Sequence, residues 1–140
     1  MKRLLLPVLI TLLLISCSKP DGPEQIIAAN IAQLEEGIEQ KDPDQVMELI
    51  HENFSTGSGA DKLWAKRSMA FYMLRHSNIE IVTSGLNISL EPDSARATFS
   101  ALITGGQGLI PEQGAWYQIE TEWRLQNDEW LLIYTNWKRD

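Results

Sequence analysis

The chain has one cysteine, Cys17, and two histidines, His51 and His76, among its 140 residues. A single cysteine excludes an intramolecular disulfide, and two histidines so far apart are weak grounds for a metal site. Cations are also scarce, because 12 Lys and Arg stand against 19 Asp and Glu for a net charge of −7. This balance argues against nucleic acid as a partner and against electrostatic docking on anionic lipid. We therefore expect no metal, no cofactor and no nucleic acid.

The sequence has one extended apolar run, from Leu4 to Ile15, which is too short to span a membrane as a helix. It follows Lys2 and Arg3, and a basic start before a short apolar run is typical of a secretory signal.

The run ends in Leu14-Ile15-Ser16-Cys17, which resembles the lipobox of bacterial lipoproteins. The resemblance implies that residues 1–16 are a signal peptide and that residues 17–23 are a lipidated Cys17 with a short tether. Residues 24–140 would then form the domain. A plain signal peptide with an unrelated cysteine is the alternative.

The tether sets where the domain would lie. Ser18 rather than aspartate follows the cysteine, and by resemblance to enterobacterial sorting this implies the outer membrane, with the domain facing the periplasm. The stretch from Ser18 to Pro23 reaches roughly 20 Å when extended. We therefore expect the membrane to be a close neighbour of the domain.

Three helices are expected first. Apolar residues recur at helical spacing from Ile27 to Ile38, and Asp42-Pro43 is typical of the start of a second, short helix. His51 is expected near the end of that helix. A capping pattern at Ser58 and Asp61 predicts a third helix from about Ala60 to Arg75, with His76 at its end. The apolar face expected on the third helix consists of Leu63, Trp64, Ala70, Phe71 and Leu74.

Four strands are expected after His76, where apolar and polar residues begin to alternate. The alternation changes parity at Gly85, which predicts a β-bulge. A two-residue turn at Asn127-Asp128 would pair Leu125 with Trp130 and Trp123 with Leu132. The predicted fold class is α+β: a roll of three N-terminal helices packed on a curved four-stranded antiparallel sheet.

This pairing sorts the side chains of the sheet onto two faces. A cavity between sheet and helices is expected to be lined by Trp64, Phe71, Tyr117, Thr121, Trp123, Trp130 and Tyr134. The opposite face is expected to carry an apolar interface for a homodimer, made of Trp116, Leu131, Ile133 and Trp137.

The stretch "TGGQGLIPEQG" separates two of the strands. Its loop from Gly105 to Gly114 is longer than an ordinary hairpin loop of about 2–5 residues. We expect a shaped lid or rim over the cavity, built on Gly105, Gly106, Gly108, Pro111 and Glu112.

The order of three helices and then strands, closed by "WRLQNDEWLLIYTNW", resembles the nuclear transport factor 2-like (cystatin-like α+β roll) superfamily. More narrowly, "LRHSNIEI", "LITGGQGLIPEQGAWYQIETEWR" and "EWLLIYTNW" are similar to a group of proteobacterial lipoproteins with this fold and no established activity. The superfamily includes ketosteroid isomerases, polyketide cyclases, dehydratases and non-catalytic binding or dimerisation modules. The fold therefore does not choose the function.

Enzymes of this fold need a buried acid or a histidine as a general base in the cavity. The glutamates of the strands all fall on the outer parity: Glu80, Glu91, Glu120 and Glu122. The inner polar groups are hydroxyls, which are poor bases near neutral pH. We therefore predict a non-catalytic envelope lipoprotein that binds a small apolar ligand or a partner protein.

Two alternatives stay open. One is a small isomerase, cyclase or dehydratase that uses His76 or Glu112 as base and Tyr117 as hydrogen-bond donor. The other is a structural dimer whose core is filled and has no cavity.

Overall fold

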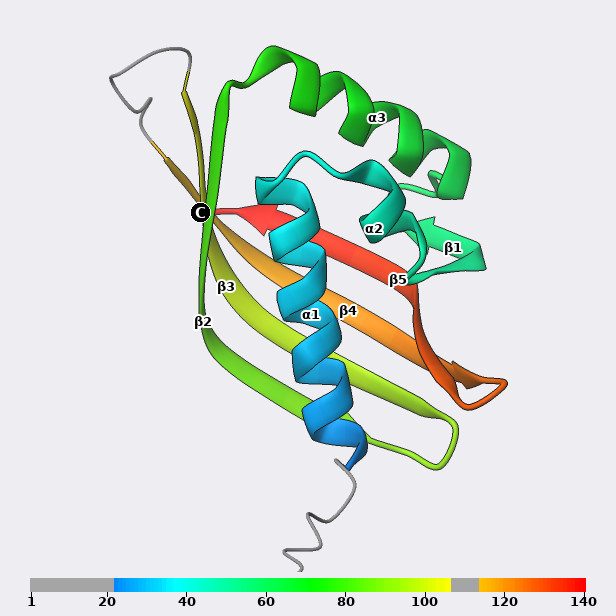
Figure 1. The fold of residues 1–140 in the computed structure, drawn as a ribbon. Helices are drawn as coiled ribbons and strands as arrows, with labels where there is room; N and C mark the ends of the chain where they lie inside the picture. Colours follow the sequence, from blue (N-terminus) through cyan, green and yellow to red (C-terminus); the bar gives the residue numbers. More distant parts are fainter. Residues whose placement is uncertain (1–21, 107–113) are drawn as a thin grey trace, which may run out of the picture.

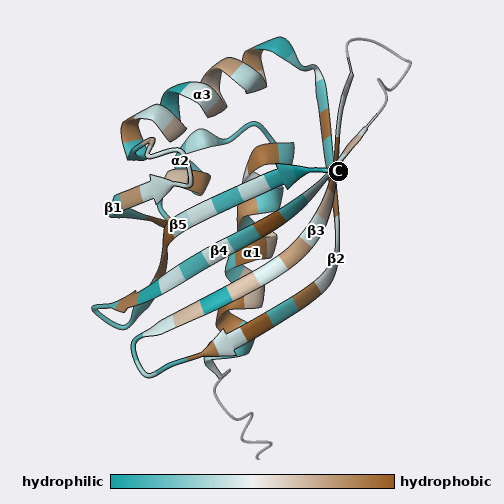
Figure 2. Cartoon of the chain, turned by 180° about the vertical axis from the view of Figure 1, so that it is seen from behind, coloured by the Kyte–Doolittle hydropathy of each residue, from teal (hydrophilic) through white to brown (hydrophobic). Residues whose placement is uncertain are grey.

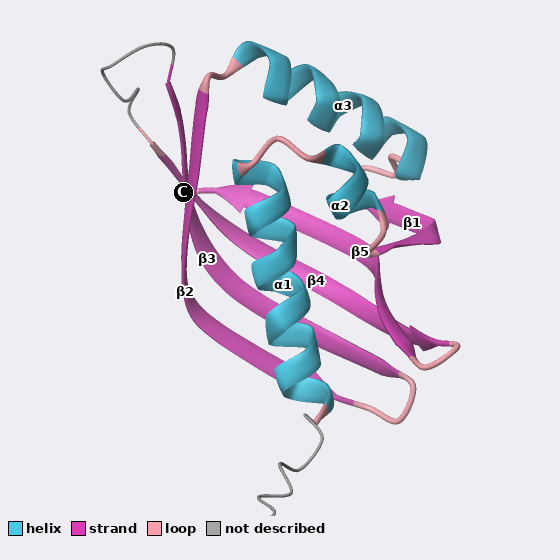
Figure 3. Ribbon diagram, in the orientation of Figure 1, coloured by secondary structure: helices cyan, strands magenta, loops and turns pink. Residues whose placement is uncertain are grey.

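A computed structural model describes residues 22–106 and 114–140 of the chain (Figure 1). The predicted signal peptide, Cys17 and most of the tether lie outside the described residues, as do Gly108, Pro111 and Glu112. The chain folds into two layers, with three helices covering one face of a curved five-stranded sheet (Figures 1 and 3). The helices are α1 (Pro23–Glu39), α2 (Pro43–Met47) and α3 (Lys62–Arg75). No helix in the described part is long and apolar enough to cross a bilayer.

Helix α2 begins where the sequence signal predicts, whereas α3 begins at Lys62 rather than at about Ala60, and its cap is Asp61 rather than Ser58. Proline occupies the first turn of α1 and of α2, where its missing N–H is not needed. The Asp42 carboxylate accepts the Gln45 backbone N–H at 3.1 Å. Asp61 does the same for Trp64 at 2.8 Å, so Asp61 caps α3.

The sheet has the order β1-β5-β4-β3-β2. Its strands are β1 (Ile50–Thr56), β2 (Asn78–Leu90), β3 (Ser94–Gly106), β4 (Ala115–Gln126) and β5 (Glu129–Arg139). Strands β2 to β5 form the expected antiparallel meander. The α+β roll is therefore confirmed, but the four-strand prediction is wrong because β1 adds a fifth strand.

Strand β1 pairs in parallel with β5, with Ile50 opposite Leu132 and Thr56 opposite Thr135. Its register is interrupted, and buried and exposed positions do not alternate simply along it. The spacing of apolar residues along this segment therefore did not predict a strand. His51 was expected at a helix end, but it lies in β1, is 7% exposed, and its Nδ1 accepts the Asn53 backbone N–H at 2.9 Å.

Both predicted local features of the meander are confirmed. Gly85 has φ of +68° and lies at the register shift between β2 and β3, as a bulge requires. Asn127 and Asp128 have φ of 50° and 64° and close a two-residue turn. The pairs that this turn predicted are found: Leu125 with Trp130 and Trp123 with Leu132.

A second bulge lies in β5, and no residue type in the sequence marks it. Trp123 pairs with Leu132, but the preceding Glu122 pairs with Tyr134. Ile133 is therefore an extra residue in β5. Because side chains alternate along a strand, one extra residue exchanges the faces of all that follow it.

This exchange makes two of the face assignments wrong. The helix-covered side is the inner face, and the side that Figure 2 shows uncovered is the outer face. Tyr134, expected in the cavity, pairs with Glu122 on the outer face. Trp137, expected at an outer interface, pairs with Ile119 on the inner face.

The core lies where α1 crosses the inner face of the sheet (Figure 1). Ile27 of α1, Ala97 of β3 and Trp123 of β4 are fully buried. The Trp123 indole donates to the Thr121 hydroxyl at 3.0 Å, and that hydroxyl donates to the Ala97 carbonyl at 2.9 Å. The small residues of β3 leave room for the large indole, and its polar atom is satisfied.

Helix α3 packs with a different face from the one expected. Ala65, Ser68, Met69 and Met73 point inward, and Trp64 and Tyr72 line the cavity while staying partly exposed. Of the expected face, Leu63, Phe71 and Leu74 are exposed and do not line the cavity. Phe71 is 60% exposed and faces away from the cavity, so the prediction that it lines the cavity is wrong. The helix carries apolar residues all around, so spacing could not select the buried side.

Candidate functional site

A cavity of about 540 Å³ lies between α3 and the inner face of the sheet. Every helix and strand contributes to its lining. The lining residues are Leu34, Ile38, Val46, Ile50, Phe54, Thr56, Trp64, Ala65, Ser68, Met69, Tyr72, His76, Ile81, Ile103, Gly105, Ala115, Tyr117, Leu132, Thr135 and Trp137. None of these described residues is Asp, Glu, Lys or Arg, so the cavity is mostly apolar and carries no fixed charge.

Two tryptophans form an aromatic wall of this cavity. Trp64 of α3 and Trp137 of β5 stack with ring centroids 6.4 Å apart and planes 13° apart. Both are 44% exposed, so the pair lies at the opening of the cavity. The β5 bulge creates this wall, because without the extra residue Trp137 would point to the outer face.

A polar notch, formed by Tyr72, His76 and Gly105, lies where α3 ends beside β3. The rings of Tyr72 and His76 are in contact, with centroids 4.1 Å apart. Nδ1 of His76 is buried and has no hydrogen-bond partner among the described residues. A Cβ at Gly105 would lie 3.0 Å from His76 Nδ1 and 3.1 Å from Tyr72 Oη. Glycine therefore leaves His76 Nδ1 uncovered on this side.

The predicted cavity residues separate into three groups. Trp64 and Tyr117 line the cavity, as does the candidate base His76. Thr121, Trp123 and Trp130 are buried in the core and do not line it, because α1 covers that part of the sheet. Phe71 and Tyr134 face elsewhere, for the reasons given above. Gly105 lines the cavity, and Gly106 ends β3.

Sequence reasoning missed Tyr72, Thr135 and Trp137 as lining residues. Tyr72 could have been found, because it precedes His76 by four positions and such pairs share one helix face. Thr135 and Trp137 could not, because their inward direction depends on the unmarked bulge.

A partly buried carboxyl was also missed, because it lies on a helix and not on a strand. Glu35 lies on α1, where the Thr83 hydroxyl of β2 hydrogen-bonds its carboxylate. Its Oε1 is buried and has no partner among the described residues. Burial raises the pKa of Glu35, the negative charge of Glu39 raises it further, and the Thr83 hydrogen bond works in the opposite direction. Glu35 does not line the cavity.

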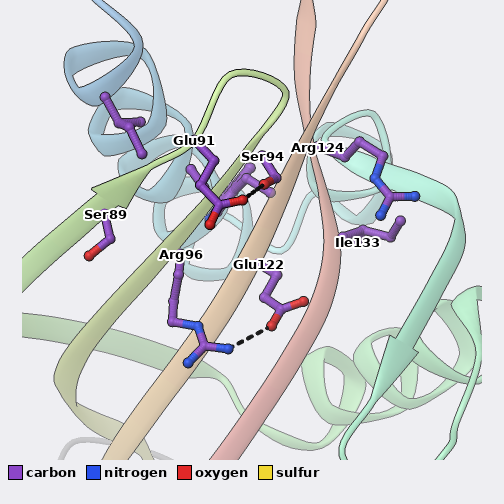
Figure 4. Close-up of a pocket in the computed structure, with 10 residues that line it drawn as sticks. Ser89, Glu91, Ser94, Arg96, Glu122, Arg124 and Ile133 are labelled. Atoms are coloured by element: carbon purple, nitrogen blue, oxygen red, sulfur yellow. Dashed lines mark hydrogen bonds and ion pairs between the residues drawn. The ribbon is translucent and has the colours of Figure 1, made fainter.

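The outer face carries a polar groove of about 490 Å³ near the β2–β3 turn. Figure 4 shows Arg96 and Glu122 pointing toward each other from neighbouring strands, at 3.0 Å. Arg96 also pairs with Glu120 at 3.3 Å. These side chains are half exposed, so solvent screens the pairs and they contribute little to stability. Charged side chains line this groove, whereas none is among the described residues that line the cavity on the inner face.

The predicted outer interface is only partly assembled. Trp116 is 43% exposed on the outer face, and Leu131 and Ile133 are partly buried. Trp137 belongs to the cavity instead. The middle of the outer face is polar, since Ser100 donates to Gln118 at 3.0 Å beside the Arg96 pairs.

No cluster of three or more His, Cys, Asp or Glu residues suited to a metal ion occurs in residues 22–106 and 114–140.

No family model matches the sequence, and a search of curated proteins gives no match. Solved structures do match. A candidate dehydratase of the NTF2-like family from Streptomyces avermitilis superposes with a TM-score of 0.77 at 18% identity, covering 86% of this chain and 99% of that one.

Two more solved structures are similar to this chain over most of its length. An NTF2-like protein from Cytophaga hutchinsonii has a TM-score of 0.70 at 16% identity, with 86% and 100% of the two chains covered. A candidate scytalone dehydratase from Novosphingobium aromaticivorans has a TM-score of 0.72 at 10% identity, with 84% and 83% covered. At these identities the likeness establishes the fold alone, and the chain has the nuclear transport factor 2-like, cystatin-like α+β fold.

Proposed function

We propose that this protein is an envelope lipoprotein whose domain binds a small apolar ligand in the inner cavity without transforming it. The observation that carries the proposal is the cavity itself. Its volume of about 540 Å³ lies in the range of about 300–1,000 Å³ of small-molecule sites. Its lining is mostly apolar with a few polar groups, which is the usual composition of such sites.

The filled-core alternative is not supported, because side chains of α3 and the sheet leave this space open. A general base of the carboxylate type is also missing from the described lining. Both observations favour binding over proton-transfer chemistry.

The lipoprotein part of the proposal rests on the sequence, since Cys17 lies outside the described residues. The lipobox-like stretch before Cys17 and the likeness to proteobacterial lipoproteins support an anchor in the outer membrane, with the domain in the periplasm. Expression of the full chain with radiolabelled palmitate tests it. Label should enter the wild-type protein and should be lost in Cys17→Ser; equal labelling of both would contradict the anchor.

Ligand binding can be tested with N-phenyl-1-naphthylamine, an uncharged apolar dye whose emission rises in apolar sites. The purified domain should bind it, and Ser68→Phe should abolish binding because the new ring fills the cavity that Ser68 lines. The expected loss in affinity is at least about tenfold.

The control is Ser84→Phe, which adds the same ring at an exposed position of β2. It should leave the dye affinity unchanged. Equal dye binding by wild type and Ser68→Phe, with both folded by circular dichroism, would contradict the cavity as the site.

A second candidate function is favoured by one observation, the unpartnered Nδ1 of His76 at the cavity. Together with the hydroxyl of Tyr117, it supports a dehydratase-type reaction. In such a reaction a base removes a proton beside a carbonyl, the β-hydroxyl leaves as water and a conjugated double bond forms.

Incubating β-hydroxy ketones with wild type and with His76→Phe tests this dehydratase function. Conjugated product formed by wild type alone would establish catalysis; equal rates would exclude His76 as a base. Glu112, the other candidate base, lies outside the described residues.

A further inference from the structure

We infer that the cavity selects a flat, uncharged apolar molecule carrying one hydroxyl or carbonyl group, and that this group binds in the polar notch of Tyr72, His76 and Gly105. The inference deepens the proposed function, because it names the class of ligand for the same cavity. It is carried by the charge, the geometry and the aromatic wall of the site.

The charge of the lining argues for an uncharged ligand. No Asp, Glu, Lys or Arg is among the described lining residues, so an ionised ligand would lose its hydration and meet no fixed counter-charge. The end of α3 beside the notch presents the negative end of the helix dipole, which disfavours an anion there.

The notch is a place in the described lining where a ligand's polar atom can meet His76 Nδ1 with Tyr72 Oη close by. His76 Nδ1 is buried without a partner among the described residues, and such an atom costs free energy unless something hydrogen-bonds to it. Tyr72 Oη lies nearby, since both atoms are about 3 Å from the same point above Gly105. A neutral imidazole offers one donor and one acceptor nitrogen, so the notch suits a hydroxyl or a carbonyl oxygen.

Gly105 is what keeps the notch open. A Cβ there would lie 3.0 Å from His76 Nδ1, which is closer than side-chain carbons normally come to a ring atom. Any larger residue would press on the imidazole and cover Nδ1. The cavity reaches all three residues of the notch.

The aromatic wall sets the shape of the ligand. Trp64 and Trp137 present nearly parallel rings, tilted by only 13°, and Phe54 and Tyr117 add further ring surface. Flat ligands gain most from such a wall, because rings stack face to face with an offset. Trp64 and Tyr72 are eight positions apart, or about 12 Å along α3, so a molecule of two rings can touch both the wall and the notch.

Three matched compounds test the inference: biphenyl, 4-hydroxybiphenyl and biphenyl-4-carboxylate. Each is titrated against the complex of the wild-type domain with N-phenyl-1-naphthylamine, and displacement of the dye gives its affinity. The hydroxyl compound should bind about tenfold more tightly than biphenyl, as one hydrogen bond to a buried unpaired group predicts. It should also bind more tightly than the carboxylate at neutral pH.

Two variants place the hydroxyl in the notch. His76→Phe keeps a ring against Tyr72 but removes Nδ1, and Gly105→Ala covers it. In both, the preference for 4-hydroxybiphenyl over biphenyl should fall to about twofold or less while biphenyl itself still binds. The matched controls are Tyr134→Phe, which removes a hydroxyl from the outer face, and Gly22→Ala, which adds the same methyl group before α1. Both controls should keep the preference.

The outcomes separate the two proposals. If the dye does not bind wild type, the proposed ligand-binding function fails, and the inference fails with it. If the dye binds but biphenyl and 4-hydroxybiphenyl compete equally, the cavity remains the proposed ligand site, but the proposal that the notch binds the hydroxyl group is overturned. Tighter binding of the carboxylate would overturn the uncharged class, and a preference that survives in His76→Phe would overturn the assignment to Nδ1.

Discussion

Glu35 is a side chain that destabilises the folded protein when it is ionised. Its carboxylate is held between α1 and β2 by Thr83, and Oε1 is buried with no partner among the described residues. Burial favours the neutral form of the acid, so its pKa is raised in the folded chain. The raised pKa means that the folded state binds a proton more readily than the unfolded state.

This direction fixes how stability depends on pH. Above the pKa that Glu35 has in the folded state, its carboxylate is ionised, and the whole cost of burying that charge lowers the free energy of unfolding. As pH falls through that pKa toward the ordinary glutamate value, the folded state takes up the proton first and the destabilisation disappears. The nearby charge of Glu39 acts in the same direction, and the Thr83 hydrogen bond reduces the effect.

Replacing Glu35 with Gln should therefore stabilise the protein at neutral pH. The expected gain in the free energy of unfolding is about 0.5–1 kcal/mol, kept small because the side chain is partly exposed and screened. Urea unfolding at a series of pH values measures it. The difference between variant and wild type should shrink as the solution becomes acidic, whereas Glu36→Gln, exposed on the same helix, should show little change. A gain that grows toward acid pH would contradict the raised pKa.

At the scale of elements, the two bulges explain what the sequence could and could not predict. The bulge at Gly85 could be predicted, because a glycine stands where the apolar parity flips. The structure gives this glycine a φ of +68°. The β5 bulge lies at Ile133, in a run of residues that is apolar on both faces, and nothing in that run distinguishes an extra residue from a regular one. Tyr134 and Trp137 were misplaced for this reason alone. The turn at Asn127-Asp128 and the pairs next to it needed only local information and were predicted.

The Gly85 bulge can be tested without altering any contact. A Cβ added there meets nothing within 4 Å, so the cost of Gly85→Ala is the positive φ alone. We expect a loss of about 1 kcal/mol in the free energy of unfolding, measured by urea titration. Gly85→Asn should cost less, since asparagine adopts positive φ more readily. Equal losses for Ala and Asn would show that the cost has another origin.

Strand β1 marks a different limit of sequence reasoning. Its partner is at the other end of the domain, since Ile50 lies opposite Leu132. Pairing of this kind is decided by the whole fold and leaves little trace in the seven residues of the strand. His51 was placed on a helix because of it.

At the scale of the molecule, the outer face is where we propose that the domain associates with itself. The apolar row on that face consists of Val82, Leu102 and Trp116, which lie opposite one another on β2, β3 and β4. Val82 is 57% exposed and Trp116 is 43% exposed. We therefore propose the homodimer around this row, which keeps Trp116 of the interface predicted from the sequence and has Val82 and Leu102 in place of Leu131, Ile133 and Trp137.

Sedimentation equilibrium with Trp116→Lys tests the dimer. If the row is the interface, wild type should sediment as a dimer, and the lysine should shift it to a monomer because the partner's row would have to bury a charge. Leu74→Lys on α3, where the leucine is 87% exposed in the other layer, is the matched control and should leave the dimer intact. A wild type that stays monomeric at high concentration would end the proposal.

The parallel pairing of β1 with β5 also limits when the domain can complete its fold. A chain synthesised in sequence order yields α1, α2 and β1 first, but β1 has no neighbour in the sheet until β5 is present. The wall of the cavity is likewise incomplete until Trp137, three residues before Asp140, is present. Contacts between such distant segments slow folding, since the intervening chain must be ordered before they form. The domain therefore cannot complete its fold until the last strand has been synthesised.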